Sequence, residues 1–312
     1  MSPEMSLEPS YLHYPRRRYG MDHARYEWSM LTERPPVRWP GNAKLAVWVN
    51  LAVQFFPLNQ RGKPFAPPGG MTTAYPDLRH YTLREYGNRV GLVRCVQALD
   101  TFGLKPTFAV NAIIAQKYPR LLERLCERDD EILCHSWHMD SLHHGELDES
   151  EEAEIIERSL ACLREATGQP IRGWLSPGGS QSHNTPDLLA SQGIEYMGDW
   201  LNDDLPYPFR TKHGDLIALP LSLELDDHFI VGVNLHSETE YAEQIKDACD
   251  FLLREAQEAE GGRLLALNVH PWLMGQPHRI AALEDALEHI ANQPGIWSAS
   301  AHEIVSAWRN AQ

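Results

Sequence analysis

Residues 86–110 read YGNRVGLVRCVQALDTFGLKPTFAV and contain one helix followed directly by one strand. The helix is expected over residues 86–102, because apolar residues recur there at helical spacing. These residues are Val90, Val93, Val96, Leu99 and Phe102. PTFAV (106–110) is a short apolar run, typical of a strand buried on both faces of a parallel sheet. This unit predicts a fold in which helices and parallel strands alternate.

The same alternation extends from about residue 43 to the end of the chain. Further strands are expected at KLAVWVNL (44–51), EILCHS (131–136), RGWLSP (172–177), YMGDW (196–200), LIALPL (216–221), RLLALNVHP (263–271) and WSASA (297–301). Helical spacing recurs in residues 148–167, 238–260 and 276–293. Eight strands with six or seven helices predict an irregular (β/α) barrel of seven to eight parallel strands. A doubly wound open sheet is the alternative. Residues 43–312 are expected to form a single catalytic domain, and residues 1–42 an N-terminal arm.

Composition limits the partners and the compartment of the chain. Its 312 residues carry a formal charge of −15, which disfavours nucleic acid and anionic membranes as partners. The amino-terminal residues have no apolar run of signal-peptide length, and no segment resembles a membrane span. Five scattered cysteines without a CxxC pair fit reduced thiols. We therefore expect a cytoplasmic protein.

Polar and aromatic side chains collect where the expected strands end. In a parallel barrel the carboxyl ends of all strands share one face, which is the catalytic face. The candidates there are Gln54, His135, Ser136, Trp137, Met139, Ser176, Trp200, Asp204, Glu224, His270 and Trp272. Any one of them has an ordinary structural explanation, such as a turn or a hydrogen-bonded core histidine. Their convergence on one face predicts an active site.

The order and spacing of several motifs resemble the polysaccharide deacetylase (NodB-homology, carbohydrate esterase family 4) superfamily over residues 35–305. The motifs are RWPGNAKLAVWVNL, LREYGNRVGLVRCVQALDTFGLKPTFAVNA, EILCHSWH, GWLSPGG, NTPDLLASQGIEYMGDWLNDDLPY and LNVHPWLMGQPHR. They are most similar to the branch of metal-independent allantoinases and cyclic-imide hydrolases. The resemblance implies an α/β barrel that hydrolyses non-peptide C–N bonds, and it suggests a homo-oligomer, with a tetramer as one option and the arm at an interface.

The chain departs from the metal-binding pattern of that superfamily. Metal-dependent members carry an Asp pair after strand one and an H-[ST]-x-x-H motif after strand three. Here Gln54 follows strand one, and Met139 stands where the second His belongs. A carboxamide and a thioether are poor ligands for a hard or borderline cation. The resemblance thus implies no cofactor. The alternatives are a His-rich zinc site formed by His135, His138, His143 and His144, and a metal site rebuilt from His138 and Asp140. Gln54 also replaces an acidic residue of the allantoinase-like branch, so allantoin itself is not the expected substrate.

These observations predict hydrolysis of a small cyclic amide, imide or ureide. His135 or His270 would activate water, because imidazole titrates near neutral pH. Asp204 or Glu224 would orient the imidazole, and the oxyanion would bind Gln54, Ser136 or N–H groups of the Ser176–Gly179 turn. Substrate contacts are expected from Trp137, Met139, Ser176, Trp200 and Trp272. Two alternatives are a metal-dependent deacetylase of an N-acetylated sugar or small amide, and a catalytically retired barrel that binds a small molecule.

Overall fold

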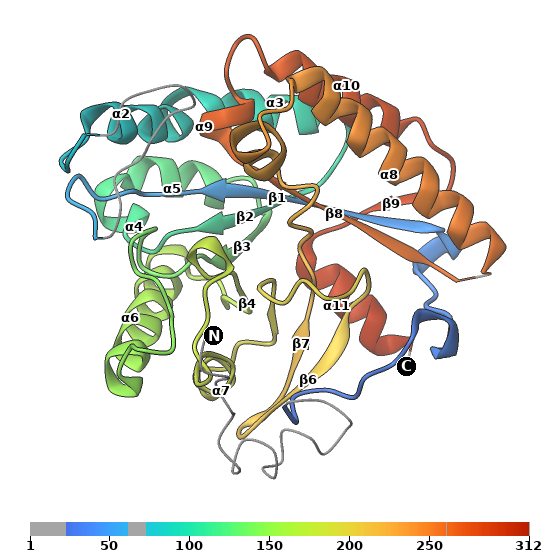
Figure 1. The fold of residues 1–312 in the computed structure, drawn as a ribbon, viewed down its shortest axis with the longest axis horizontal. Coiled ribbons are helices and arrows are strands. Elements are labelled where there is room, and N and C mark those ends of the chain that lie inside the picture. Colours follow the sequence, from blue (N-terminus) through green and yellow to red (C-terminus); the bar gives the residue numbers. More distant parts are fainter. Residues whose placement is uncertain (1–22, 62–72, 260, 312) are drawn as a thin grey trace, which may run out of the picture.

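The structure is a computed structural model that describes residues 23–61, 73–259 and 261–311. Within these residues nine strands form a single sheet (Figure 1). The strands are β1 (Leu45–Val53), β2 (Pro106–Val110), β3 (Glu131–Cys134), β4 (Gly173–Trp174), β5 (Tyr196–Met197), β6 (Tyr207–Thr211), β7 (Gly214–Ala218), β8 (Arg263–Val269) and β9 (Ile296–Ser298). All eight expected strands are confirmed. The additional strand, β6, was not expected.

The sheet is curled and parallel for most of its width. Its strand order is β6-β7-β5-β4-β3-β2-β1-β8, and β9 pairs with the start of β1. Only the β6–β7 pair is antiparallel among the described strands. The end strands β6 and β8 are not paired with each other there, so the sheet forms a half-barrel. This confirms the irregular α/β barrel.

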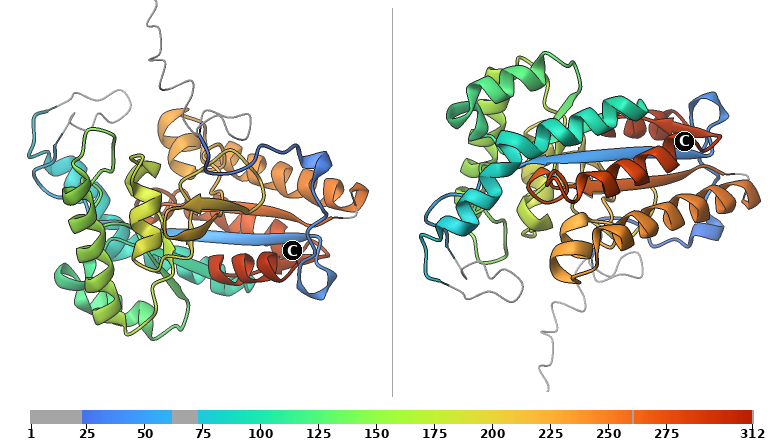
Figure 2. Two further views of the ribbon diagram at one scale, coloured as in Figure 1. Left: turned by 90° about the horizontal axis from the view of Figure 1, so that it is seen from below. Right: turned by 90° about the horizontal axis from the view of Figure 1, so that it is seen from above.

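Ten helices surround the sheet within the described residues, and most of them flank its outer face (Figure 2). They are α2 (Leu78–Tyr86), α3 (Leu92–Phe102), α4 (Ile114–Lys117), α5 (Pro119–Cys126), α6 (Glu149–Thr167), α7 (Thr185–Ser191), α8 (Glu238–Glu258), α9 (Pro271–Met274), α10 (Ile280–Ala291) and α11 (Ala301–Asn310). The helices expected over residues 148–167, 238–260 and 276–293 correspond to α6, α8 and α10. Helices α8 and α10 pack side by side over the region of β8 and β1.

The apolar stripe expected over residues 86–102 is confirmed in part, because Leu99 is buried and Val96 and Phe102 pack against the core. A π-helical segment, Gly87–Gly91, separates α2 from α3. The core-facing residues of α3 are Leu92, Cys95, Ala98 and Leu99, while Val93 is 53% exposed. Residues spaced by three drift around a helix of 3.6 residues per turn, so Val93 points away from the face that Leu99 buries. The sequence pattern alone does not reveal the π-helical segment.

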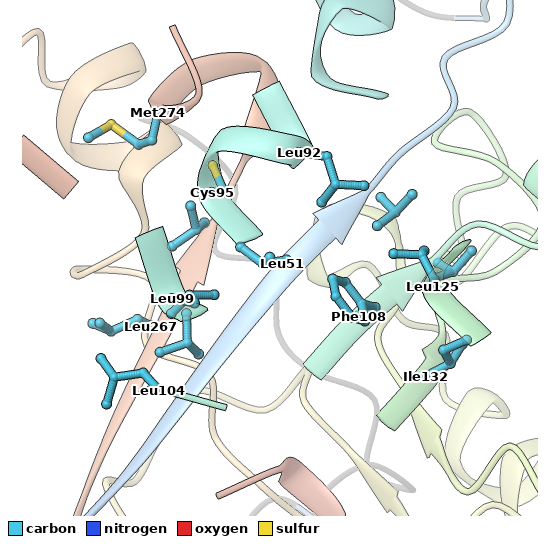
Figure 3. Packing of buried hydrophobic residues seen from close by; sticks show 14 of the residues in the cluster. Leu51, Leu92, Cys95, Leu99, Leu104, Phe108, Leu125, Ile132, Leu267 and Met274 are labelled. Atoms are coloured by element: carbon cyan, nitrogen blue, oxygen red, sulfur yellow. The ribbon is translucent and has the colours of Figure 1, made fainter. Parts of the chain in front are cut away.

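Alternate residues of each strand separate two hydrophobic layers. Leu51, Phe108 and Leu267 face the helices and pack with Leu92 and Leu99 (Figure 3). Residues of the opposite parity face the interior of the curled sheet, where they form a smaller cluster. Its members include Ala46, Trp48, Ala109, Leu133, Leu264 and Ala266.

Helix α11 closes this interior at the amino-terminal ends of the strands. Ile304, Val305 and Trp308 of α11 belong to the interior cluster. The backbone N–H of Ala301 donates to Thr107 at the start of β2. The opposite opening, at the carboxyl ends of the strands, is therefore the one left for a ligand.

The described part of the N-terminal arm lies against the domain. The indole of Trp39 donates to the carbonyl of Arg263, 2.8 Å away, and Tyr26 packs edge-on against Tyr207. Tyr11, Tyr14 and Tyr19 of the arm, which the sequence offers as aromatic residues for an interface, lie outside the described residues. Among the described helices, none has the length and apolar character needed to cross a bilayer.

Candidate active site

A cavity of about 330 Å³ opens at the carboxyl ends of the strands. Gln54, His135 and His270 line its floor, and Met139 and Trp272 line its wall. The strand pattern explains why the three floor residues meet. Each lies an even number of residues beyond an inward-facing position, so each side chain enters the interior of the sheet. These inward positions are Trp48 on β1, Leu133 on β3 and Ala266 on β8.

Two contacts fix the carboxamide of Gln54. Its Oε1 accepts a hydrogen bond from Nε1 of Trp272 at 3.2 Å. Its Nε2 therefore points the other way, toward Nε2 of His135 at 3.4 Å. Because an indole nitrogen only donates, the amide oxygen must face Trp272. Gln54 thus presents N–H groups to the cavity floor.

His135 is a buried, neutral imidazole. Its Nδ1 lies 2.7 Å from the carbonyl oxygen of Leu175, to which it donates. Burial, with a smaller contribution from the charge of His270, lowers the pKa of His135 to about 4 despite the opposing effect of the Leu175 carbonyl. With the proton on Nδ1, the Nε2 atom keeps its lone pair. His135 therefore offers a proton acceptor to the cavity at neutral pH.

His270, in contrast to His135, favours the protonated state. Its Nδ1 lies 2.5 Å from Oδ1 of Asp227, and its backbone N–H donates to Oδ2 of the same carboxylate at 2.7 Å. Oδ1 of Asp226 lies 3.8 Å from the same ring nitrogen. Burial acts to lower the pKa of His270, but the two carboxylates outweigh it and the net shift is upward. His270 is therefore a proton donor through Nε2.

Arg84 of α2 brings a positive charge to the cavity wall. Its guanidinium carbon lies 3.3 Å from the centre of the Trp272 ring and 4.9 Å from that of Phe56. Burial lowers the pKa of Arg84 to about 9, against the attraction of Asp227. Burial also lowers the pKa of the neighbouring His228 to about 4. No signal in the sequence marked either residue.

Asp199 organises the turn after β4. It accepts hydrogen bonds from the backbone N–H of Ser176 at 2.7 Å, from the Ser176 hydroxyl at 2.9 Å and from Gln181 at 2.6 Å. Burial raises the pKa of Asp199 to about 6, despite these donors. The Gly179 N–H donates to the Ser176 carbonyl. The N–H groups of Ser176 and Gly179 are thus already bonded, which leaves Gly178, a residue that lines the cavity, as the member of the turn to which the oxyanion expectation applies.

The structure brings together six of the eleven candidates, namely Gln54, His135, Met139, Ser176, His270 and Trp272. The other five, Ser136, Trp137, Trp200, Asp204 and Glu224, are not among the residues that line this cavity in the described chain. The Ser136 hydroxyl lies 3.1 Å from Nε2 of the buried His143. The ring of Trp137 lies beneath Arg158, and Trp200 packs against Phe209.

The expected carboxylate partners of the histidines are corrected. Asp204 lies near Arg263, at the start of β8 and hence at the opposite end of the strands. Glu224 is exposed to solvent. Asp227 occupies the position expected for one of them, next to Nδ1 of His270. The sequence placed Asp227 and Glu224 in the same loop after one strand, and spacing alone could not rank them.

The side chains at this site do not fit a divalent metal ion. The cavity offers His135, the Gln54 carboxamide and the Met139 thioether, whereas zinc takes three or four His, Cys or carboxylate ligands. A cluster of Asp226, Asp227 and His270 has suitable ligand types. Its atoms are already bonded to one another and to protein donors, since Asp226 accepts from Asn268 and from the N–H of His228. The Asp–His–His set of metal-dependent relatives is therefore not reproduced.

Comparison with known proteins shows which family the chain resembles. Residues 85–197 match the family Polysaccharide deacetylase. The chain is 25% identical over 301 residues to the Schizosaccharomyces pombe protein named "Putative polysaccharide deacetylase", covering 86% of this chain and 92% of that one. The structure matches that of Puue Allantoinase with a TM-score of 0.79 and 26% identity, covering 90% of this chain and 95% of the other. It also matches a probable polysaccharide deacetylase from Pseudomonas aeruginosa PAO1, with a TM-score of 0.78, 25% identity, and coverage of 89% and 95%.

Residues 85–197 thus match a polysaccharide deacetylase (NodB/CE4) domain, and the curled half-barrel is similar to the folds of the matched structures. The similar proteins carry names of deacetylases, and an allantoinase is among the structural neighbours.

Proposed function

We propose that the protein hydrolyses a C–N bond of a small cyclic amide, imide or ureide without a metal ion. The observation that carries this proposal is that two buried imidazoles share one cavity floor and differ in protonation. One is neutral at its Nε2 atom, and the other favours the protonated form. Nε2 of His135 carries no proton, because the ring proton is on Nδ1, whereas Asp227 favours the protonated form of His270. A base and an acid on opposite sides of a carbonyl are what amide hydrolysis requires.

In the proposed reaction, His135 takes a proton from a water molecule as its oxygen attacks the ring carbonyl. The Gln54 N–H groups stabilise the negative charge that develops on the carbonyl oxygen. His270 then donates its Nε2 proton to the leaving nitrogen as the C–N bond breaks. His135 ends with one proton more and His270 with one fewer, and exchange with solvent restores both. Strained or conjugated rings have electrophilic carbonyls, so they depend less on a Lewis acid.

A second candidate is deacetylation of an N-acetylated sugar or small amide. The matched family and the names of relatives favour it. Such an enzyme would need a bound divalent ion, which Gln54 and Met139 do not favour as ligands. Metal content therefore separates the two candidates.

The test uses protein purified without added metal, checked by elemental analysis, with and without a chelator. The substrates are hydantoins, cyclic imides, allantoin and N-acetyl amines. We expect turnover of ring substrates at substoichiometric metal, with no loss on chelation. Turnover confined to N-acetyl amines and dependent on added metal would support the deacetylase instead. Binding without any turnover would identify a retired barrel.

The partners and compartment of the protein remain proposals of the same kind. We propose a small-molecule substrate, no nucleic-acid or membrane partner, a cytoplasmic location and a homo-oligomer with the N-terminal arm at an interface. The charge of −15 and five unpaired cysteines support the first part. Sedimentation at micromolar concentration tests the last part, since a folded monomer would contradict it.

A further inference from the structure

The mouth of the cavity is apolar and exposed. Leu201, Leu223 and Val233 all line it, and they are 46%, 47% and 57% exposed. They come from three separate segments, which follow β5, follow β7 and end the π-helical segment His228–Val233. Single exposed apolar residues are ordinary. Three that converge on one cavity mark a surface that a ligand covers.

The apolar surface continues inward to the reacting groups. Leu175, Leu221 and Phe229 also line the cavity and are more buried than the three rim residues. The polar lining includes Gln54, His135 and His270 at the floor and Arg84 at the wall. A ligand that matches this division has a polar, hydrolysable head and an apolar part on the side that faces the opening.

We propose that the substrate is a cyclic amide or imide whose ring carries an alkyl or aryl substituent on carbon. This inference rests on the proposed function and specifies its substrate class. The ring places its carbonyl on the floor, and the substituent lies against Leu201, Leu223 and Val233. A cavity of about 330 Å³ holds one ring with one substituent.

A sugar chain or an unsubstituted ureide matches this mouth poorly. Both carry hydrogen-bonding groups around their whole perimeter, and those groups lose water on binding without gaining partners from the three rim side chains. The structure therefore favours substrates that carry an apolar group away from the bond that is hydrolysed over substrates that lack one. Each apolar contact of this size changes kcat/KM by about 10-fold to 200-fold.

The test compares matched pairs of rings, succinimide with 2-benzylsuccinimide and hydantoin with 5-benzylhydantoin. We expect kcat/KM to be at least about 10-fold higher for the substituted member of each pair. Val233→Ser should reduce this ratio several-fold. Val93→Ser is the matched control, because Val93 is 53% exposed on α3 and is not among the residues that line the cavity. The ratio compares two substrates on one protein, so a partly unfolded variant still reports it.

Failure of this inference and failure of the proposed function give different results. Turnover of both members with a ratio of one or below would overturn the inference and leave the proposed function standing. If no ring is hydrolysed, equilibrium binding followed by tryptophan fluorescence replaces kinetics. Tighter binding of the benzyl compounds then supports the apolar subsite without the reaction, and equal binding overturns it. A third result combines a kcat/KM ratio of one with a Val233→Ser variant that sediments as a smaller species than the parent. It would assign the three rim residues to a contact between copies of this chain, and it too would overturn the inference.

Discussion

Oδ1 of Asp227 lies 2.5 Å from Nδ1 of His270, and the other oxygen of the same carboxylate accepts the backbone N–H of His270. The carboxylate therefore fixes both the ring and the main chain of this residue. It also fixes the orientation of the ring, because the Nδ1–H group that is bonded to Asp227 leaves Nε2 facing the cavity.

Asp227→Asn should weaken proton donation by His270. Loss of the negative charge lowers the pKa of the imidazole, so the alkaline limb of the kcat/KM profile should move to lower pH. Turnover of a ring substrate at neutral pH should fall by about 10²-fold or more, as it should in His270→Ala. Glu224→Gln is the control, because Glu224 is exposed. Equal effects of Asp227→Asn and Glu224→Gln would contradict the assignment.

The pH profile should also show an acid limb far below the usual histidine range. Burial lowers the pKa of His135 to about 4. The base form is required, so activity should be lost only as the pH falls through about 4. The raised pKa of His270 places the loss at alkaline pH above 6.5. We thus expect a plateau between these limits in kcat/KM measured with a ring substrate. An acid limb near pH 6.5 would show that His135 is not the base.

The sequence predicted the strands better than the site, for a physical reason. Buried parallel strands are apolar runs, and eight of them were recognised from composition alone. The alternation of side chains along a strand then places Gln54, His135 and His270 on one face. The antiparallel strand β6 was missed because Tyr207–Thr211, with the sequence YPFRT, contains proline and alternates poorly.

Loops set the remaining contacts, and loops have no such periodicity. Asp227 and Glu224 share one loop, and only the path of the main chain decides which of them meets His270. The π-helical segment Gly87–Gly91 likewise follows from tertiary packing, because the two glycines lie against the start of α9. Arg84 enters the cavity from the preceding helix, and its chemistry in the sequence is that of any surface arginine.

Two substitutions should convert the cavity into a site that binds zinc. Gln54→Asp combined with Met139→His supplies a carboxylate and a second imidazole beside His135, which is a ligand set that zinc accepts. Elemental analysis should find zinc retained by the double variant and only substoichiometric metal in the parent. Met139→Leu serves as the control, since it removes the thioether without adding a ligand. One tightly held zinc per chain in the parent protein would contradict the assignment of a metal-free floor.

A buried polar network should stabilise the loop after β3. Nδ1 of His143 lies 3.0 Å from Glu152 on α6, and Nε2 of His143 lies 3.1 Å from the Ser136 hydroxyl. Ser182 also donates to Glu152. Hydrogen bonds to a buried charge contribute about 1.5–3 kcal/mol each, so Glu152→Gln should lower the free energy of unfolding in urea by about that amount. Glu151→Gln, exposed on the same helix, should have no measurable effect.

The same network predicts a pH dependence of stability. Burial acts to raise the pKa of Glu152, but hydrogen bonds from His143, Ser182 and Thr185 outweigh it, and the pKa falls below its usual value of 4.5. A lowered folded-state pKa means that the contribution is complete above pH 4.5 and is lost as the pH falls through the lower value. The difference in unfolding free energy between the parent and Glu152→Gln should therefore shrink in acid. A difference that grew below pH 4.5 would contradict this sign.

Gly91→Ala should damage both stability and catalysis. A Cβ at residue 91 would lie 1.9 Å from the carbonyl oxygen of Pro271, and backbone on both sides leaves no flexible side chain to move away. Pro271 separates His270 from Trp272, which holds the Gln54 carboxamide, so a shift there disturbs the cavity floor directly. Overpacking of this kind costs about 1–3 kcal/mol or more, measurable as a lower midpoint of urea unfolding. Gly145→Ala is the matched control, because a Cβ there meets nothing within 4 Å. If Gly91→Ala decreased turnover of a ring substrate only as much as Gly145→Ala does, the prediction would be wrong. The close approach of the π-helical segment to Pro271 would then have no part in holding the site together.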